Sequence, residues 1–341
     1  MSIAVGRGFL LIFKLLATTP RGPIDGWRRR DSHVRIHRGL PASADRPVAL
    51  TIGNFDGIHR GHQAMLVRLI EAADDLRLPP AVMTFEPHPR EFFAPETAPP
   101  RLTSLRAKLE FFRAFGIASV FVTRFDRGLA SLAPSAFIED VLVARVGVRW
   151  VLVGDDFRFG KARAGDIATL RAHARDFSVE GMGTVEADGQ RVSSTAVRDA
   201  LTAGDMERVA SLLGRPYAIA GRVGHGEKLG RQLGFPTANI ALRHRPALSG
   251  IFAVRVHGLP GGARPGVASL GVRPTVKSGG RPLLEVFLFD FDQPIYGRRV
   301  TVEFLHKLRD EVRYPDLDAL AAQIRTDVAQ ARDYFASPSG A

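Results

Sequence analysis

The chain has 341 residues, of which 45% are hydrophobic and 24% are charged, a length and composition that favour a folded protein of two domains. It contains no cysteine, which excludes disulfides, thiolate metal sites and a cysteine nucleophile and points to a cytoplasmic location. The formal net charge of +12 is compatible with nucleic-acid binding, but its distribution along the chain argues against that function.

The N-terminal segment carries half of the excess positive charge. Its first 40 residues hold eight Lys or Arg residues against two Asp residues, which accounts for +6. The apolar run at residues 8–17 is too short to span a bilayer and is interrupted by Lys14. We expect residues 1–33 to be a dispensable, disordered basic extension, with a weak amphipathic membrane anchor as the alternative. Neither a nucleic-acid partner nor stable membrane association is expected, and self-association stays open.

The next part of the chain alternates between strand-like and helix-like segments. Four short apolar runs have the composition of buried strands, at residues 47–52, 81–85, 119–123 and 150–153. Three segments between them place apolar side chains at helical spacing, at residues 62–77, 104–115 and 134–146. This alternation predicts a Rossmann-like α/β domain with a parallel sheet and helices on both faces, which we assign to residues 34–214.

The pattern changes character after Gly214. Gly and Pro become frequent, and short alternating runs predict antiparallel strands at residues 217–223, 250–256, 266–270, 283–291 and 299–304. A helix is predicted at residues 317–335, after the start signal of Pro315 and Asp316. We therefore expect residues 215–341 to form a small antiparallel β-barrel with a terminal helix.

The first candidate site is the run from Gly53 to His62, which lies between a predicted strand and a predicted helix. An open α/β sheet binds its ligand at such a junction. The glycines allow a tight turn, and His59 and His62, three residues apart at a helix start, form an anion site together with the helix N-terminus. The alternative is a glycine-rich turn with two exposed histidines. The chain has no P-loop sequence, and the spacing of these histidines does not fit a zinc site.

This run resembles the H-x-G-H signature of the nucleotidylyltransferases, and more narrowly that of bifunctional bacterial riboflavin kinase/FMN adenylyltransferases. Three further segments resemble the later motifs of that family, at residues 84–89, 154–160 and 191–198. The resemblance begins at about Val34 and covers the rest of the chain. It implies that the C-terminal half phosphorylates riboflavin to FMN and that the N-terminal half adenylylates FMN to FAD, with ATP as co-substrate and Mg²⁺ as the metal.

For adenylyl transfer, the resemblance assigns His59 and His62 to the ATP phosphates, and Ser194, Thr195 and Arg198 to the departing pyrophosphate. The FMN phosphate is already an anion when it attacks, so positioning and charge stabilisation suffice without a general base. Asp156 stands where one common form of the family has Asn. The expected ATP-binding residues of this half are Gly53, Phe55, Asp56, Gly57, His59, Gly61, His62, Asp156, Arg191, Ser194, Thr195 and Arg198.

For the kinase half, the glycine-rich stretch at residues 221–239 resembles a flap that closes over ATP. Its end, Pro236 to Asn239, resembles the P-T-A-N motif, in which the Thr hydroxyl and the Asn side chain hold Mg²⁺. By itself this tetrapeptide would be an ordinary turn. The expected ATP-binding residues of this half are Gly221, Arg222, Gly226, Lys228, Gly230, Pro236, Thr237 and Asn239, the last two being the metal ligands.

Glu285 is the candidate base of the kinase reaction. Strand periodicity puts it on one face with Phe287, Phe289 and Phe291. In the matching position the family carries a catalytic Glu, which would take the proton from the ribityl 5′-hydroxyl as that oxygen attacks the γ-phosphate of ATP. The alternative is a strand-edge Glu paired with Arg273 or Arg299. The expected flavin-binding residues are Arg273, Thr275, Glu285 and Arg309, of which Arg309 approaches either the flavin or the nucleotide.

Two other functions are compatible with parts of this pattern. The H-x-G-H signature also occurs in class I aminoacyl-tRNA synthetases, so an RNA-associated protein is one alternative. A monofunctional FMN adenylyltransferase with a flavin-sensing barrel is the other. Glu285, Thr237 and Asn239 argue against a sensor, because binding alone requires neither a base nor a metal pair.

Overall fold

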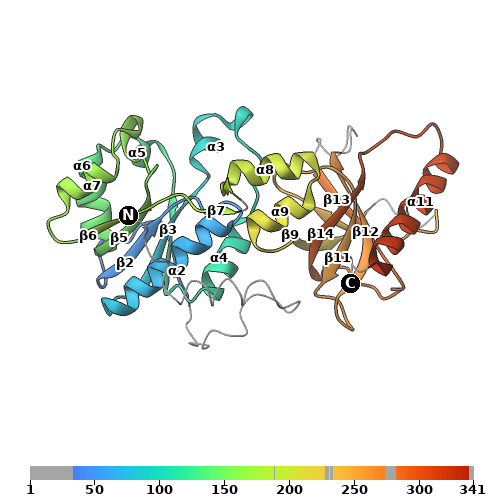
Figure 1. Ribbon diagram of the computed structural model, residues 1–341, viewed down its shortest axis with the longest axis horizontal. Helices are drawn as coiled ribbons and strands as arrows, with labels where there is room; N and C mark the ends of the chain where they lie inside the picture. The colour runs from blue at the N-terminus through green and yellow to red at the C-terminus, as the bar shows by residue number, and fades with distance from the viewer. Residues whose placement is uncertain (1–33, 188, 227–229, 231–232, 273–281, 338–341) are drawn as a thin grey trace. The chain divides into compact units, whose positions relative to one another are not determined.

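The computed structural model describes residues 34–187, 189–226, 230, 233–272 and 282–337, which fold into two compact units (Figure 1). The first unit comprises the described residues of Met1–Pro99 and Ser104–Val192. The second comprises those of Pro100–Thr103 and Ser193–Ala341. The division into units therefore falls before the two helices that precede the barrel, whereas the functional boundary at residue 214 stays a prediction.

The first unit contains a parallel sheet of six strands in the order β1-β4-β3-β2-β5-β6. The strands are β1 (Arg35–Arg38), β2 (Val48–Ile52), β3 (Pro80–Glu86), β4 (Ser119–Arg124), β5 (Val148–Gly154) and β6 (Ser178–Met182). All five residues of the central strand β2 are buried, as expected for a strand covered on both faces. The predicted α/β fold is confirmed. The periodicity did not reveal the edge strands β1 and β6, because they are short and largely polar.

Helices cover both faces of this sheet (Figure 1). The longer ones are α2 (Arg60–Asp75), α4 (Leu105–Ala114), the π-helical segment η2 (Phe137–Val146) and α7 (Ile167–His173). The shorter ones are α3 (Pro89–Phe93), η1 (Pro95–Thr97), α5 (Arg127–Ala130), α6 (Pro134–Ala136) and η3 (Lys161–Arg163), and a two-stranded ribbon joins β7 (Glu186–Ala187) to β8 (Gln190–Arg191).

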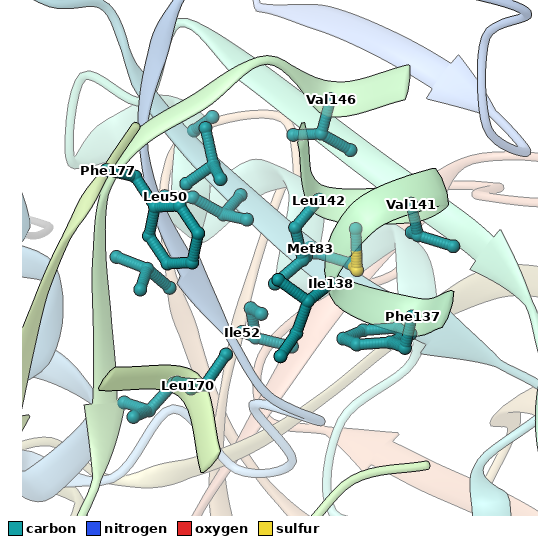
Figure 2. Close-up of a cluster of buried hydrophobic side chains, with 14 of the residues drawn as sticks. Leu50, Ile52, Met83, Phe137, Ile138, Val141, Leu142, Val146, Leu170 and Phe177 are labelled. Atoms are coloured by element: carbon teal, nitrogen blue, oxygen red, sulfur yellow. The ribbon is translucent and has the colours of Figure 1, made fainter. Parts of the chain in front are cut away.

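Alternate residues of the strands enter two different hydrophobic cores. Leu50 and Ile52 of β2 pack with Met83 of β3 against Ile138 of η2 and Leu170 of α7 (Figure 2). Ala49, which precedes Leu50 and faces the other side of the sheet, belongs to the second core, which contains buried residues of α2 and α4: Leu66, Leu69, Ile70 and Phe112. The two cores hold the strand ends and the first turn of α2 in place, which positions the loop between β2 and α2.

In the part of the chain that the structure describes, the second unit is a closed antiparallel barrel accompanied by helices. Two helices, α8 (Ser194–Ala203) and α9 (Met206–Leu213), precede the barrel, and α11 (Leu317–Ala336) follows it. The barrel strands are β9 (Tyr217–Gly224), β10 (Thr237–Ala241), β11 (Gly250–His257), β12 (Arg264–Val272), β13 (Pro282–Leu288) and β14 (Arg299–Arg309), closed in the order β10-β13-β12-β11-β14-β9. The predicted barrel and terminal helix are confirmed. Thr237 and Asn239, for which an ordinary turn was the alternative, lie at the start of strand β10.

Strand β13 sets the direction of the candidate base. Leu284, Val286 and Leu288 are buried, and they alternate with the half-buried Glu285 and Phe287 on the outer face of the barrel. Phe289 joins the same hydrophobic cluster as Phe287 beneath α11. The strand ends at Leu288 and Asp290 has a left-handed backbone (φ 51°), so the predicted alternation does not extend to Phe291.

Among the described residues, no helix is long and apolar enough to cross a membrane.

Candidate functional sites

The loop that joins β2 to α2 has an unusual backbone. Phe55 (φ 49°), Gly57 (φ 91°) and Ile58 (φ 45°) are all left-handed, a conformation that is costly for the two non-glycine residues. Phe55 and Ile58 are fully buried, and the Phe55 ring meets Phe112 edge-on at 5.3 Å between centroids. Packing therefore compensates for the backbone strain. The loop lies at the carboxyl end of β2 and leads into the N-terminus of α2, where anions bind readily.

Two side chains hold the Asn54 carbonyl in this loop. Lys108 Nζ donates to the Asn54 carbonyl oxygen at 3.0 Å, and Thr84 Oγ1 donates to it at 3.3 Å. Lys108 lies on α4 and is only 3% exposed. A buried ammonium group is costly without nearby compensation, and the Asn54 carbonyl oxygen provides part of that compensation.

His59 and His62 lie in direct contact, as their spacing predicts. Their rings stack with centroids 3.7 Å apart, and the backbone N–H of His62 donates to His59 Nδ1 at 3.3 Å, so His59 caps α2. Burial, followed by the charges of His59 and Lys108, holds the pKa of His62 well below its ordinary value of 6.5. His62 is therefore neutral at pH 7, and it offers a hydrogen bond rather than the full charge of an imidazolium. Lys108 and the helix N-terminus supply the positive charge.

The glycines of this loop act in different ways. The left-handed backbone favours glycine at Gly57, whereas at Gly53 and Gly61 a side chain would fit only tightly. A Cβ atom at Gly53 would lie 3.1 Å from the Phe55 ring, and one at Gly61 would lie 3.2 Å from the His59 ring. Asp56 is buried beside them at 4% exposure. The four residues are thus part of the packing that shapes the loop.

The remaining predicted residues of this site fall into two groups. Arg191 Nη2 donates to Asp156 Oδ2 at 2.6 Å, so the structure brings these two exposed residues together. Ser194, Thr195 and Arg198 lie on α8 in the second unit, where Ser193 caps the helix and Arg198 Nε donates to the Pro100 carbonyl oxygen at 2.7 Å. The grouping of these α8 residues with His59 and His62 stays a prediction.

The second site lies on the outer face of the barrel beside α11. The strand register aligns Asn239 of β10 with Glu285 of β13, and Glu285 with Ser269 of β12. The next row aligns Thr237, Phe287 and Val267 in the same way. Except for Asn239, the residues of these rows form one wall of a cavity of ≈ 360 Å³ that residues of α11 also line. Glu285 therefore lines a cavity. Its strand β13 does not pair with β14, the strand that carries Arg299.

Thr237 and Asn239 have the chemistry of a magnesium site. Asn239 Nδ2 donates to the Thr237 carbonyl oxygen at 3.1 Å, which turns Oδ1 the other way. Within the described part of the chain, that buried Oδ1 has no hydrogen-bond partner. A Cβ atom at Gly226 would lie 2.6 Å from the Asn239 side chain, so the glycine-rich strand end leaves room for it. An unsatisfied amide oxygen beside a hydroxyl fits a hard cation that takes its other ligands from phosphates.

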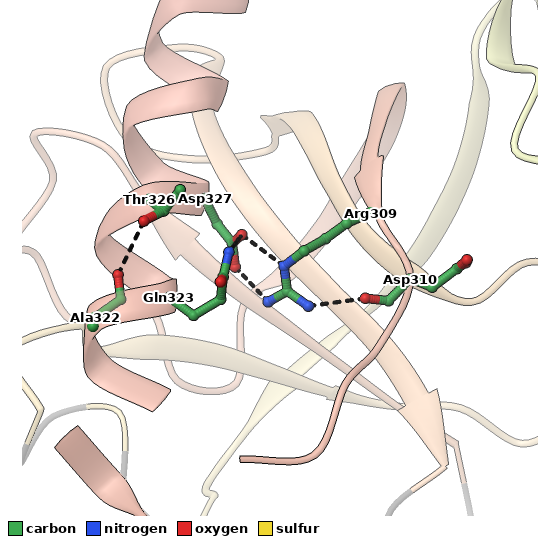
Figure 3. A network of polar contacts seen from close by, with 6 residues as sticks. All are labelled: Arg309, Asp310, Ala322, Gln323, Thr326 and Asp327. Atoms are coloured by element: carbon green, nitrogen blue, oxygen red, sulfur yellow. Dashed lines mark hydrogen bonds and ion pairs between the residues drawn. The ribbon is translucent and has the colours of Figure 1, made fainter. Parts of the chain in front are cut away.

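Arg309 lines the cavity, but its guanidinium is directed at α11 (Figure 3). Its Nε and Nη2 donate to Asp327 Oδ1 and Oδ2 at 2.7 and 2.6 Å, and its Nη1 donates to the Asp310 carbonyl oxygen at 2.8 Å. Gln323 Nε2 also donates to Asp327 Oδ1, at 2.9 Å. The hydrogen bonds with Asp327 raise the pKa of Arg309. In this structure Arg309 fastens α11 to β14, which keeps the cavity wall in place.

Comparison with known proteins decides the family. Two family models match, FAD synthetase over residues 42–196 and riboflavin kinase over residues 213–335. The chain is 50% identical over 307 residues to a bifunctional riboflavin kinase/FMN adenylyltransferase of Pseudomonas fluorescens, covering 89% of this chain and 95% of that one. It is 48% identical over 311 residues to the corresponding protein of Haemophilus influenzae, covering 89% and 100%. The chain belongs to the bifunctional riboflavin kinase/FMN adenylyltransferase family.

A solved structure agrees with the family fold. A crystal structure of a macrolide-efflux protein from Streptococcus pneumoniae is similar to this chain, with a TM-score of 0.75 and 28% identity over 88% of this chain and 99% of that chain. Membership of the bifunctional family, with a match to each half, favours the predicted double function over the two alternatives, an RNA-associated protein and a flavin sensor.

Several residues of these sites did not emerge from the sequence. Lys108 was detectable only as a basic residue on the apolar face of a helix, three and four residues from Leu105 and Phe112. An aromatic cluster at the carboxyl ends of β3 and β4 was also missed; it comprises Phe85, Phe92, Phe93 and Phe125, with ring centroids 5.3–5.8 Å apart. Three predicted residues lie outside the described ones: Lys228, Arg273 and Thr275.

Proposed function

We propose that this chain phosphorylates riboflavin to FMN in its barrel and adenylylates FMN to FAD in its α/β unit, using ATP in both reactions. One observation carries this proposal: each half matches a different family model, and each half has a site suited to the matching reaction. A cavity with Glu285 beside Thr237 and Asn239 suits phosphorylation of a hydroxyl. A loop with His59, His62 and a buried lysine suits transfer between phosphates.

In the kinase reaction, Glu285 takes the proton of the 5′-hydroxyl as that oxygen attacks the γ-phosphate of ATP. Thr237 and Asn239 hold Mg²⁺, which when bound neutralises charge on the phosphates. Asn239 is the register partner of Glu285, so the proton acceptor stands next to the place where the phosphates are held. Phe287 and the apolar residues of α11 that line the cavity enclose the flavin ring.

In the adenylylation reaction, the FMN phosphate attacks the α-phosphate of ATP and pyrophosphate leaves. Neutral His62 donates a hydrogen bond to the ATP phosphates together with His59, while Lys108 and the N-terminus of α2 stabilise the negative charge. Ser194, Thr195 and Arg198 bind the departing pyrophosphate. Phe93, which is 67% exposed at the edge of its aromatic cluster, provides a surface on which the flavin ring stacks.

The test is chromatography of flavins after the purified protein has been incubated with ATP, Mg²⁺ and either riboflavin or FMN. Wild-type protein is expected to convert both to FAD. A Glu285→Ala variant is expected to convert FMN normally but to phosphorylate riboflavin about 100-fold or more slowly, which is the usual cost of losing a general base.

Glu303→Ala is the matched control, because Glu303 lies on another strand of the barrel and pairs with His257 at 2.8 Å. It is expected to keep both activities. If wild-type protein forms neither FMN nor FAD, the proposed function is wrong. If Glu285→Ala still phosphorylates riboflavin at the wild-type rate, only the assignment of the base is wrong.

A further inference from the structure

The kinase cavity contains a second carboxylate that the proposed mechanism does not use. Glu311 follows the end of β14 and lines the same cavity as Glu285. Burial, and then the negative charge of Glu285, raise the pKa of Glu311, while Arg309 and a hydrogen bond from the Ser269 hydroxyl act in the opposite direction. Glu311 thus lies within the electrostatic reach of the proposed base and in contact with Ser269.

The strand register shows how these groups are arranged. Ser269 is the register partner of Glu285 on the neighbouring strand, so their side chains stand side by side on the outer face of the barrel. Gly271 lies two residues further along β12 on the same face, and a Cβ atom there would overlap the Glu311 carboxylate. Because Gly271 does not have a left-handed backbone, its lack of a side chain serves to make room for Glu311.

Two neighbouring carboxylates and a hydroxyl attract either a cation or a group of hydroxyl donors. The proposed mechanism already holds the cation at Thr237 and Asn239, which leaves hydroxyl donors as the partners of Glu311 and Ser269. Much of the remaining wall is apolar, with Val267, Phe287 and Ile324 among the lining residues. The cavity therefore suits a ligand with an apolar part and a chain of hydroxyls, one of which meets Glu285.

We propose that Glu311, together with Ser269, binds the internal hydroxyls of the substrate's polyol chain and thereby directs its terminal hydroxyl at Glu285. This inference rests on the proposed riboflavin kinase function and adds a residue that selects the substrate. Arg309 does not take this part, because its guanidinium already donates to Asp327 and to the Asp310 carbonyl. Glu311 accepts hydrogen bonds from hydroxyls, and a carboxylate is a stronger acceptor for them than a neutral amide.

The experiment compares two substrates in wild-type protein and in Glu311→Gln. One is riboflavin, and the other is a flavin whose ring nitrogen carries a 5-hydroxypentyl chain, which keeps the terminal hydroxyl and lacks the internal ones. Wild-type protein is expected to favour riboflavin in kcat/KM, and Glu311→Gln is expected to reduce that preference about tenfold, mainly through the KM for riboflavin. Ser269→Ala is expected to shift the preference in the same direction by a smaller factor.

Glu303→Gln serves as the control for a carboxylate lost elsewhere on the barrel, and it is expected to keep the wild-type preference. An equal loss of kcat/KM for both flavins in Glu311→Gln and Ser269→Ala would overturn the inference, since that is the result of a purely structural role. A change in the Mg²⁺ requirement with an unchanged preference would overturn it too. Wild-type protein that phosphorylates neither flavin would refute the proposed function itself, and the inference with it.

Discussion

The two sites of this chain use opposite charges. The loop between β2 and α2 combines a buried lysine, a helix N-terminus and a histidine held neutral, whereas the barrel cavity contains Glu285 and Glu311 beside the oxygen groups of Thr237 and Ser269. The difference follows from the two nucleophiles. A phosphate is already ionised and needs positive charge around it, whereas a hydroxyl must lose a proton to a base.

The largest effect is expected when the positive charge is removed from the first site. Lys108→Met is expected to slow FMN adenylylation about 100-fold or more, because one charged donor to the phosphates is lost and the Asn54 carbonyl keeps only its hydrogen bond from Thr84. Riboflavin phosphorylation by the same protein is expected to stay normal. Steady-state rates with FMN and with riboflavin check both statements.

Arg106→Met is the matched control for this variant, because Arg106 lies on the same helix and forms an exposed pair with Glu110. It is expected to keep the wild-type rate. Should Lys108→Met adenylylate FMN as fast as this control, Lys108 would have no part in the first site.

The second prediction concerns the wall of the barrel cavity. Asp327→Asn is expected to lower the free energy of unfolding of the second unit by about 3 kcal/mol, because it leaves the Arg309 guanidinium facing a neutral group in a largely buried position. The exposed pair between Arg332 and Asp290 provides the control, and Asp290→Asn is expected to cost much less, because solvent screens an exposed ion pair. Denaturant unfolding of both variants tests the difference, and equal losses would contradict it.

The third prediction uses the low pKa of His62. An unfolded His62 binds a proton as the pH falls through about 6.5, whereas the folded residue stays neutral until a lower pH. The unfolded state therefore binds more protons in this window, so the stability contribution that is present above pH 6.5 declines on acidification, by at most about 1.4 kcal/mol per pH unit. Unfolding curves of wild type and His62→Gln between pH 7 and 5 should differ in this slope. Identical slopes would show that His62 titrates normally.

The smallest expected effect is at the exposed aromatic surface. Phe93→Ala is expected to raise the KM for FMN in adenylylation about fivefold, because stacking on an exposed ring contributes about 1 kcal/mol. The kcat for FMN and the KM for riboflavin in the kinase reaction are expected to be unchanged. Tyr296→Ala is the matched control, because Tyr296 is another exposed aromatic residue. Phe289 is unsuitable because it is buried. An unaltered KM for FMN would remove Phe93 from the site.

Much of the fold was predictable because it depends on local periodicity. Buried strands and amphipathic helices repeat their apolar residues every two or 3.6 positions, and this was enough to predict the order of the main elements, the parallel sheet, the barrel and the face that Glu285 shares with Phe287. It failed where local signals are weak. The edge strands β1 and β6 are short and partly polar, and strand β10 begins with the polar residues Thr237 and Asn239.

The sequence alone determined two features of the candidate sites: the residue types in the turn before α2 and those on one face of β13. Both depend only on residues that are close together along the chain. Only the tertiary structure decided what these residues meet. Lys108 reaches Asn54 from 54 positions away, Asp327 holds Arg309 from the last helix, and Glu311 rests against a glycine of a different strand. The charge state of His62 likewise depends on burial and on a lysine from another helix. Such contacts depend on how elements pack, and packing leaves no periodic pattern in the sequence.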